Sequence, residues 1–286
     1  MKILILNGGG VFGYIPAYFL WVQRGATRAN SMFDAYGGTS IGGVEALVFA
    51  NNGTFEELNL FFLHNVDDIF AKSFWDKFNP FGPSHGDKGL DKALKIALPG
   101  ALGAVTRPVV VPAVDFKHNK PKVYDNISAN PDMFLPLWEI GRATVAAPTY
   151  FNPFNGYIDG GLIANMPILE TACALKEKLG IQFEEMEFLV MGTGEYKNRV
   201  RSMSAVYRWT ALDWLRPMLD YLTKGNELRS NFIAQQLPFK KYVYFNPVVL
   251  DEDWKMDDPT LISALKSRCD KNMDDFKLCL DGFMVD

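Results

Sequence analysis

The sequence predicts an α/β protein with three layers, in which a mostly parallel central sheet lies between helices on both faces. The first observation is a set of continuous apolar runs, at residues 3–6, 108–115 and 187–191, which suit strands buried on both faces. The second is that helical segments alternate with such runs along the chain. The third is that glycine-rich turns follow the first and the last of these runs.

The composition describes a folded protein and excludes several other classes. A chain of 286 residues with 48% hydrophobic and 22% charged residues can bury a large core, which excludes a disordered protein. The net charge of -4 argues against general nucleic-acid binding. The 22 phenylalanines and 6 tryptophans favour an apolar substrate or surface. No repeat, linker or low-complexity stretch interrupts the chain, and we therefore expect a single domain over residues 1–286.

The cysteines and the N-terminal segment predict a cytoplasmic protein. Cys173, Cys269 and Cys279 are sparse and odd in number, which argues against a disulfide framework. The apolar run at residues 3–6 is too short for a signal peptide, and no run approaches the length of a membrane span. The sequence has no His/Cys ligand cluster and no calcium-binding loop, so we expect neither a metal nor a cofactor.

The chain opens with a strand, a glycine loop and a helix. We expect the strand at residues 3–6 and the helix at residues 14–23, with Pro16 in its first turn, where proline is tolerated. The loop between them is Gly8-Gly9-Gly10-Val11-Phe12-Gly13. Such a loop leaves backbone N–H groups unpaired at a helix N-terminus, where they suit an anion.

Two hypotheses compete for this loop. Its glycines match the spacing G-x-G-x-x-G of the dinucleotide-binding fingerprint, for which Asp34 is the one candidate acidic residue. Alternatively, the amides of Gly8, Gly9, Gly10 and Val11 form an oxyanion hole. We favour the oxyanion hole because the chain around Asp34 runs into a second glycine-rich turn, and that turn carries a serine.

The second turn, Gly38-Thr39-Ser40-Ile41-Gly42, matches the pattern G-x-S-x-G of a nucleophile elbow. An apolar segment at residues 32–36 precedes it, and a helix-forming segment at residues 44–50 follows. The small residues let the strand and the helix come close, and the helix aims its positive end at Ser40. The pattern is common, and the alternative is a glycine-rich turn that only lets a strand pack on a helix.

A helix and an aromatic segment come next. Thr54 and Glu57 form a capping-box pattern at the start of a helix that we expect to end at about His64. Residues 68–86 combine Phe, Trp and Lys with Pro and Gly, which predicts an irregular loop. Aromatic residues beside lysines suit a membrane interface or a lid. The alternative is a loop whose aromatic side chains close the edge of the core.

The later elements continue the alternation. We expect strands at 108–115, 157–158, 187–191 and 241–245, an edge strand at 122–124, and helices at 89–98, 135–146 and 166–179. An apolar helix at 203–222, interrupted at Pro217, is interpreted as buried, with a place at the substrate mouth as the alternative. A final helix after Asp258 and Pro259 carries an apolar stripe that includes Cys269.

A serine nucleophile needs a base, and Asp159 is the best-placed candidate. The chain has three histidines, His64, His85 and His118. All three precede the late strand ends where a hydrolase places its histidine, and we expect the last two to be exposed. Asp159 instead ends an expected strand, and Gly160 and Gly161 behind it leave room for a second chain segment. The alternative is an ordinary Asp-Gly-Gly turn.

These motifs together resemble the patatin-like phospholipase family over about residues 3–196. The resemblance rests on the glycine loop at 8–13, the elbow around Ser40 and the turn that begins at Asp159. Further similar segments lie at 143–151, 165–167 and 192–195. The chain has Asn7 and Phe12 where the family often has an aspartate and a basic residue.

The resemblance implies a patatin-like fold, with residues 200–286 as an extension, and ester hydrolysis by a serine–aspartate dyad. Ser40 would attack the ester carbonyl, Asp159 would accept its proton, and water would release the fatty acid from an acyl-enzyme. The supporting glycines would be Gly38, Gly42, Gly160 and Gly161. The implied substrates are phospholipids or related acyl lipids, met at a peripheral membrane surface. Two alternatives stay open: a nucleotide-binding α/β protein that uses the loop at 8–13, and a lipid-binding effector with little turnover.

Overall fold

The computed structural model describes residues 1–71, 83–197 and 203–285. Its main sheet has seven strands, and the path β4-β3-β2-β1-β6-β8 is joined by β5, which pairs with β3. The strands are β1 (Lys2–Leu6), β2 (Ala35–Gly38), β3 (Val109–Asp115), β4 (Lys120–Asp125), β5 (Tyr157–Asp159), β6 (Glu187–Met191) and β8 (Lys241–Phe245). Only β4 and β5 run antiparallel to their neighbour β3, so the predicted mostly parallel sheet is confirmed.

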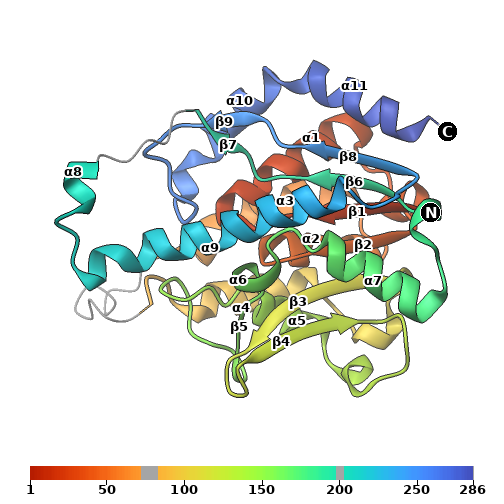
Figure 1. The fold of residues 1–286 in the computed structure, drawn as a ribbon, viewed down its shortest axis with the longest axis horizontal. Coiled ribbons are helices and arrows are strands. Elements are labelled where there is room, and N and C mark those ends of the chain that lie inside the picture. The colour runs from red at the N-terminus through yellow and green to blue at the C-terminus, as the bar shows by residue number, and fades with distance from the viewer. Residues whose placement is uncertain (72–82, 198–202, 286) are drawn as a thin grey trace.

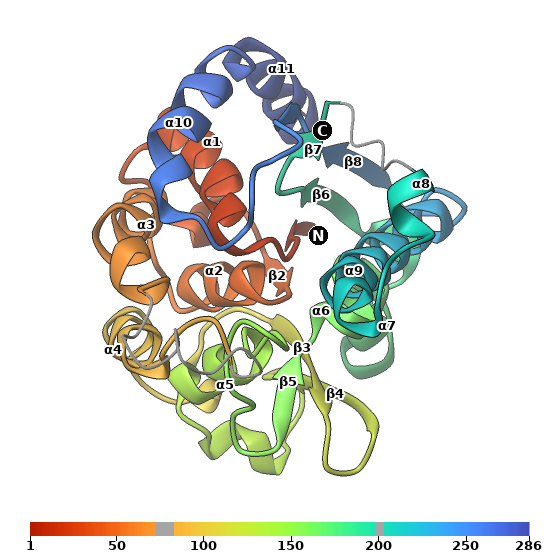
Figure 2. The same ribbon diagram turned by 90° about the vertical axis from the view of Figure 1, so that its left-hand side faces the viewer.

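Helices cover both faces of this sheet (Figures 1 and 2). Side chains of β1 alternate between two cores: Leu4 and Leu6 join the core on one face, and Ile3 and Ile5 join the core on the other. The first core is covered by α1 (Tyr14–Arg24), α2 (Ile41–Ala50), α3 (Phe55–Ile69), α4 (Asp87–Ala97) and α5 (Leu137–Thr144). On the second face lie α6 (Gly161–Ala164), α7 (Ile168–Leu179) and α9 (Ala211–Ala234). The predicted three-layer α/β/α class is therefore confirmed.

The C-terminal segment is built into the same body. After α8 (Met203–Val206) and α9, strand β8 extends the main sheet, and β9 (Val248–Leu250) pairs with β7 (Glu195–Tyr196) in a separate two-stranded sheet. The helices α10 (Ile262–Asp270) and α11 (Met273–Met284) then pack on the first core. The prediction of a single final helix is wrong, because the chain forms two helices here, and the first ends at Asp270 before the second begins at Met273. Its apolar stripe is nevertheless buried at Leu265, Cys269, Phe276 and Leu280.

The helix before the aromatic segment is longer than expected. Its capping box is confirmed: Thr54 Oγ1 accepts a hydrogen bond from the Glu57 amide at 3.0 Å, and Glu57 Oε2 accepts one from the Thr54 amide at 2.8 Å. The helix continues past His64 to Ile69 because Val66 and Ile69 still face the core. Most of the predicted aromatic loop, residues 72–82, lies outside the described residues.

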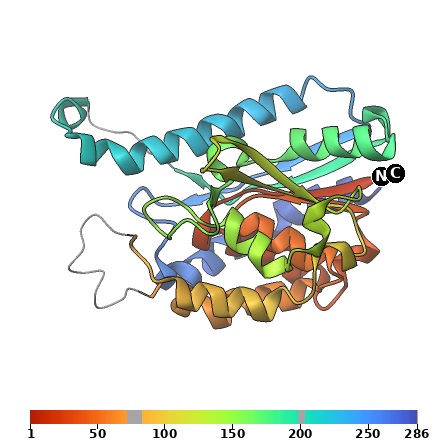
Figure 3. The ribbon, with the colours of Figure 1, turned by 90° about the horizontal axis from the view of Figure 1, so that it is seen from below.

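The helix predicted at 203–222 is not buried as we interpreted it, whereas the alternative position at the mouth of the site agrees with Leu219 and Thr223, which line the pocket that contains Ser40. Two helices occupy this region, and α9 runs without interruption through Pro217 to Ala234. Its outer face is apolar but exposed, at Trp214, Met218, Tyr221, Leu222, Leu228 and Phe232. Figure 3 shows α9, in cyan, beside α7 and extending past the sheet to α8. Within the described ranges, no helix combines the length and the apolar character needed to cross a membrane.

The packing of α11 predicts that the C-terminal segment contributes to global stability. The Phe276 ring is fully buried, 5.0 Å from the rings of Phe19 and Phe245. Phe276→Ala should lower the free energy of unfolding by about 3–5 kcal/mol, because it leaves a cavity in a close-packed core. Phe134→Ala, at a ring that is 87% exposed, is the control and should change little. Urea unfolding measures both, and equal small effects would show that α11 is only loosely attached.

Candidate active site

Ser40 lies on a strained turn between β2 and α2. Its backbone has φ 55° and ψ -129°, a conformation that a residue with a side chain rarely adopts. The flanking glycines are required by space: a Cβ at Gly38 would lie 2.0 Å from Gly42 O, and one at Gly42 would lie 2.3 Å from Leu6 O. The predicted elbow is therefore present, and its two glycines serve the close approach of strand and helix.

Two threonines hold this turn in place. The Ser40 amide donates to Thr144 Oγ1 at 2.9 Å, and that hydroxyl donates to Pro112 O at 2.6 Å. Thr39 Oγ1 donates to Ala164 O at 2.5 Å. Because Thr144 ends α5 and Pro112 lies in β3, these bonds connect the elbow to two neighbouring elements. Such support is what a strained backbone needs in order to persist.

Asp159 reaches the serine from an antiparallel strand. Strand β3 continues beyond its pairing with β2, and β5 runs back along this extension until Asp159 stands opposite Ala113. There Ser40 Oγ donates to Asp159 Oδ2 at 2.7 Å, and the Gly161 amide donates to Asp159 Oδ1 at 2.7 Å. A Cβ at Gly160 would lie 2.2 Å from Pro112 O, so only glycine allows this approach.

Burial raises the pKa of the Asp159 carboxyl. The residue is 5% exposed, and burial raises the pKa of its carboxyl from 3.8 to about 6. The hydrogen bonds from Ser40 and Gly161 act in the opposite direction, since they stabilise the charged form. A carboxylate with a raised pKa is a stronger base than an exposed aspartate, and it is aimed at the hydroxyl of the serine.

None of the three histidines lines the pocket that contains Ser40. His64 is exposed on α3, and His118 Nδ1 lies 2.9 Å from Asp115 Oδ2 at the β3–β4 turn. The prediction that His85 is exposed is wrong: the ring is fully buried, with Nε2 3.1 Å from Asp257 Oδ2. Its burial follows from packing against the rings of Phe70 and Phe151, which are themselves part of the pocket wall.

The glycine loop supplies fewer free amides than expected. The Gly8 amide donates to Asn165 O at 3.2 Å, and the Val11 amide donates to Met256 O at 2.8 Å, so the prediction that these two serve an oxyanion is wrong in this structure. The cause is Met256, from the segment after β9, which covers the loop beside Gly10. Among the described residues, none accepts a hydrogen bond from the N–H of Gly9 or Gly10.

The dinucleotide hypothesis fails on the position of Asp34. This residue precedes β2, at the opposite end of the strand from the glycine loop, and its Oδ2 accepts a hydrogen bond from the Lys2 amide at 2.8 Å. The fingerprint requires an acidic residue at the carboxyl end of the second strand. The dinucleotide-binding hypothesis therefore has no acidic residue at the required position, because Asp34 was its one candidate.

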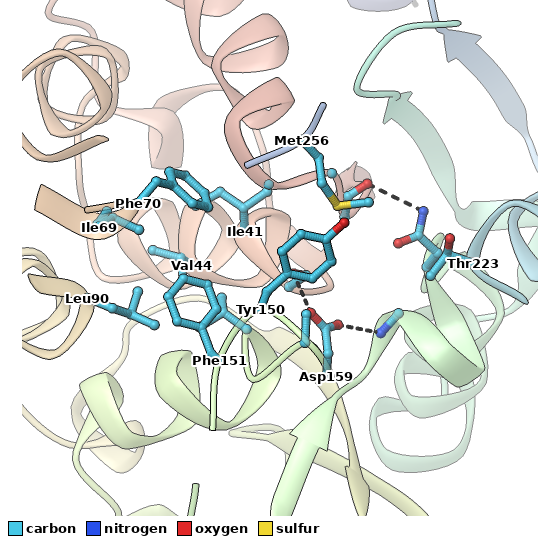
Figure 4. A pocket seen from close by; sticks show the side chains of 18 of the residues that line it. Ile41, Val44, Ile69, Phe70, Leu90, Tyr150, Phe151, Asp159, Thr223 and Met256 are labelled. Carbon is cyan, nitrogen blue, oxygen red and sulfur yellow. Dashed lines mark hydrogen bonds between the residues drawn. The ribbon is translucent and has the colours of Figure 1, made fainter. Parts of the chain in front are cut away.

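Ser40 and Asp159 open into a mostly apolar cavity. Figure 4 shows Val44, Ile69, Phe70, Leu90 and Phe151 gathered on one side, with Asp159 on the other. Phe61, Phe62, Val66 and Leu94 extend the apolar wall, so α2, α3 and α4 all contribute to it. Gly9 and Gly10 also line the cavity.

Sequence reasoning found Ser40 and Asp159, which the structure brings into contact, but missed the residues that hold them. Thr144, Asn165 and Thr193 lie in segments that were noticed without being given a role. Asn226 and Glu227, on α9, carried no signal at all, because a polar pair on a helix is ordinarily exposed. Only the fold brings these residues to the loops of the site.

The sequence is similar to those of known patatin-like proteins. The family model described as patatin-like phospholipase matches residues 4–172, more than half of the chain. The chain is 29% identical to a cGAMP-activated phospholipase of Escherichia coli, over 88% of this chain and 81% of that protein. It is 28% identical to Patatin-17 of Solanum cardiophyllum, over 75% of this chain and 66% of that protein. VipD from Legionella pneumophila aligns at a TM-score of 0.48 with 13% identity, over 96% of this chain and 67% of that one.

The raised pKa of Asp159 predicts a pH-dependent cost in stability. The folded state binds a proton more tightly than the unfolded chain, so the free energy of unfolding should fall as the pH rises from about 4 to about 6. A pKa that rises from 3.8 to about 6 corresponds to about 3 kcal/mol. Asp159→Asn removes the buried charge, so its free energy of unfolding should exceed that of the wild type by this amount at pH 7.5. At pH 4 the two should be equally stable.

Urea unfolding at the two pH values tests this expectation. Asp253→Asn, a substitution at an exposed aspartate, is the matched control and should follow the wild type at both. An Asp159→Asn variant that is less stable than the wild type at pH 7.5 would contradict the prediction.

Proposed function

The chain belongs to the patatin-like phospholipase family, a family of lipid acyl hydrolases, and we propose that it cleaves carboxylic esters of phospholipids or related acyl lipids through a dyad of Ser40 and Asp159. The observation that carries the proposal is the 2.7 Å hydrogen bond from Ser40 Oγ to Asp159 Oδ2 at the edge of an apolar cavity. In this arrangement the base touches the nucleophile directly, and no histidine is needed between them.

The proposed reaction has two halves. In the first, Asp159 takes the hydroxyl proton while Ser40 Oγ attacks the ester carbonyl, and the amides of Gly9 and Gly10 stabilise the oxyanion. The intermediate collapses to an acyl-enzyme as the leaving alcohol takes the proton from Asp159. In the second half, Asp159 accepts a proton from water, which attacks the acyl-enzyme. The fatty acid leaves, and the proton returns to Ser40.

The cavity supports an acyl lipid rather than a small polar ester. Its wall beside Ser40 is formed by aliphatic and aromatic side chains of α2, α3 and α4. Burying an acyl chain there is favourable by about 0.8 kcal/mol per methylene. Because such substrates reside in membranes, we also propose that the protein works at a peripheral membrane surface. The alternative of a lipid-binding effector would keep the cavity but would not require turnover.

Removal of either dyad residue should abolish hydrolysis. Ser40→Ala and Asp159→Asn should each lower kcat by about a thousandfold or more, and the double variant should be scarcely worse, because the two residues act as a unit. Assays with a short soluble ester and with phospholipid vesicles measure the effect. Asp115→Asn, which disrupts an aspartate–histidine pair away from the cavity, is the control and should retain activity. An Asp159→Asn variant with about a tenth of the wild-type rate would place the base elsewhere.

The same carboxyl predicts the acid side of the pH profile. Asp159 must be ionised to accept the proton, and burial raises its pKa to about 6. The value of kcat/KM on a soluble ester should therefore be constant above this pH and should fall below it with the slope of a single proton. A profile that stays flat down to about pH 4, near the ordinary value of 3.8, would contradict the proposed base.

A further inference from the structure

The carbonyl of Gly8 is held by two side chains from separate parts of the chain. Thr193 Oγ1 donates to Gly8 O at 3.1 Å, and Asn165 Nδ2 donates to the same oxygen at 3.4 Å. Asn165 also binds the other side of this residue, because its own carbonyl accepts the Gly8 amide at 3.2 Å. Thr193 follows β6 and lies beyond residue 172, where the match to the family model ends.

These two hydrogen bonds to the Gly8 carbonyl set the direction of the Gly9 N–H. In a trans peptide the C=O of one residue and the N–H of the next point to opposite sides. A Gly8 carbonyl held toward Thr193 and Asn165 therefore turns the Gly9 N–H away from them. The loop is also closely packed, since a Cβ at Gly9 would lie 2.4 Å from Thr193 Oγ1. Gly9 lines the cavity, and its amide has no acceptor among the described residues.

The orientation of Asn165 is in turn set by α9. Glu227 Oε2 accepts from Asn165 Nδ2 at 3.1 Å, and Asn226 Oδ1 accepts from the Asn165 backbone amide at 2.7 Å. A carboxylate accepts but does not donate, so it selects the orientation in which the NH₂ end of Asn165, not its oxygen, faces Gly8 O. The opposite orientation would bring two oxygens together at Gly8 and at Glu227.

Glu227 is itself fixed on all sides. It is 6% exposed, and its second oxygen, Oε1, accepts from Lys224 Nζ at 2.6 Å and from the Tyr244 hydroxyl at 2.9 Å. A buried carboxylate is tolerated only when its oxygens have such partners. The neighbouring Asn226 donates to Gly161 O at 2.7 Å, so α9 contacts both the loop of the base and the loop of the oxyanion.

We propose that Thr193 and Asn165 position the Gly9 amide in the oxyanion hole, and that Glu227 on α9 positions Asn165. This inference rests on the proposed ester hydrolysis and assigns it three positioning residues, two of them outside the segment that the family model matches. Thr193 and Glu227 do not line the cavity, and Asn165 Nδ2 is bound to Gly8 O and Glu227 Oε2. Each acts by fixing the direction of a backbone donor, so its loss should weaken the transition state more than the bound substrate.

Thr193→Val tests the proposal most directly, because valine keeps the shape and removes the donor. It should lower kcat on a soluble ester by about 10- to 100-fold with little change in KM, less than the ~10²–10³ for removal of an oxyanion donor itself. Thr193→Ser restores the hydroxyl and should recover most of the rate. Thr171→Val is the matched control: its buried hydroxyl donates to Pro167 O at 2.7 Å on α7, and activity should be unchanged.

A second readout separates positioning from general damage. A long-chain alkyl trifluoromethyl ketone forms an oxyanion adduct with the serine, whereas the matching alkyl alcohol only occupies the cavity. Thr193→Val should weaken the ketone in proportion to kcat/KM, leave the alcohol affinity unchanged, and keep the acid side of the pH profile where the wild type has it. Equal losses for both ligands would mean that the threonine is merely structural and would overturn the proposal.

The α9 contribution is tested by a pair of variants. Glu227→Gln keeps an acceptor for Asn165 and should retain most of the rate, whereas Glu227→Ala should lose ketone affinity as Thr193→Val does. If the wild type hydrolyses esters and both Glu227→Ala and Thr193→Val match it, the positioning inference fails alone. If the wild type has no Ser40-dependent hydrolysis, the proposed function itself fails.

Discussion

The site depends on one hydrogen bond between residues 119 positions apart in the chain, the bond from Ser40 to Asp159. Ser40 leaves the end of a parallel strand, whereas Asp159 arrives on a strand that runs the other way. The two meet only because β3 extends beyond its pairing with β2 and offers its free edge to β5. A three-residue strand thus fixes the position of Asp159, the proposed base, and the glycine that follows it allows the backbone to lie against β3.

Much of this arrangement was predictable, for reasons that particular residues make clear. Continuous apolar runs identified β1, β3 and β6, because strands buried on both faces show no alternation. The motif around Ser40 identified the elbow, since few residues other than glycine fit at positions 38 and 42. The prediction that the helix at 203–222 is buried was wrong because it rested on apolar composition. Composition shows that a helix has apolar side chains, but it does not show which of its faces the fold covers.

The residues that sequence reasoning missed share a physical feature: their partners are backbone atoms of distant loops. Thr144 and Thr193 each bond to a carbonyl or amide of another element, and no spacing in the sequence encodes such a contact. The same holds for Met256, whose carbonyl occupies the Val11 amide. Motifs therefore located Ser40 and Asp159, whereas the supporting contacts could be read only from the folded chain.

The number of charged side chains in the cavity explains why a dyad would suffice for the proposed chemistry. Among the described residues that line it, Asp159 is the only one with a charged side chain. When Asp159 takes the proton, the negative charge passes from the carboxylate to the oxyanion, so the cavity holds one negative charge throughout. A histidine base would instead create a cation and an anion together, and the cation would need a carboxylate beside it. Moving a single charge over a short distance requires only amide donors at its destination, and in the proposed mechanism the Gly9 N–H is one of these donors.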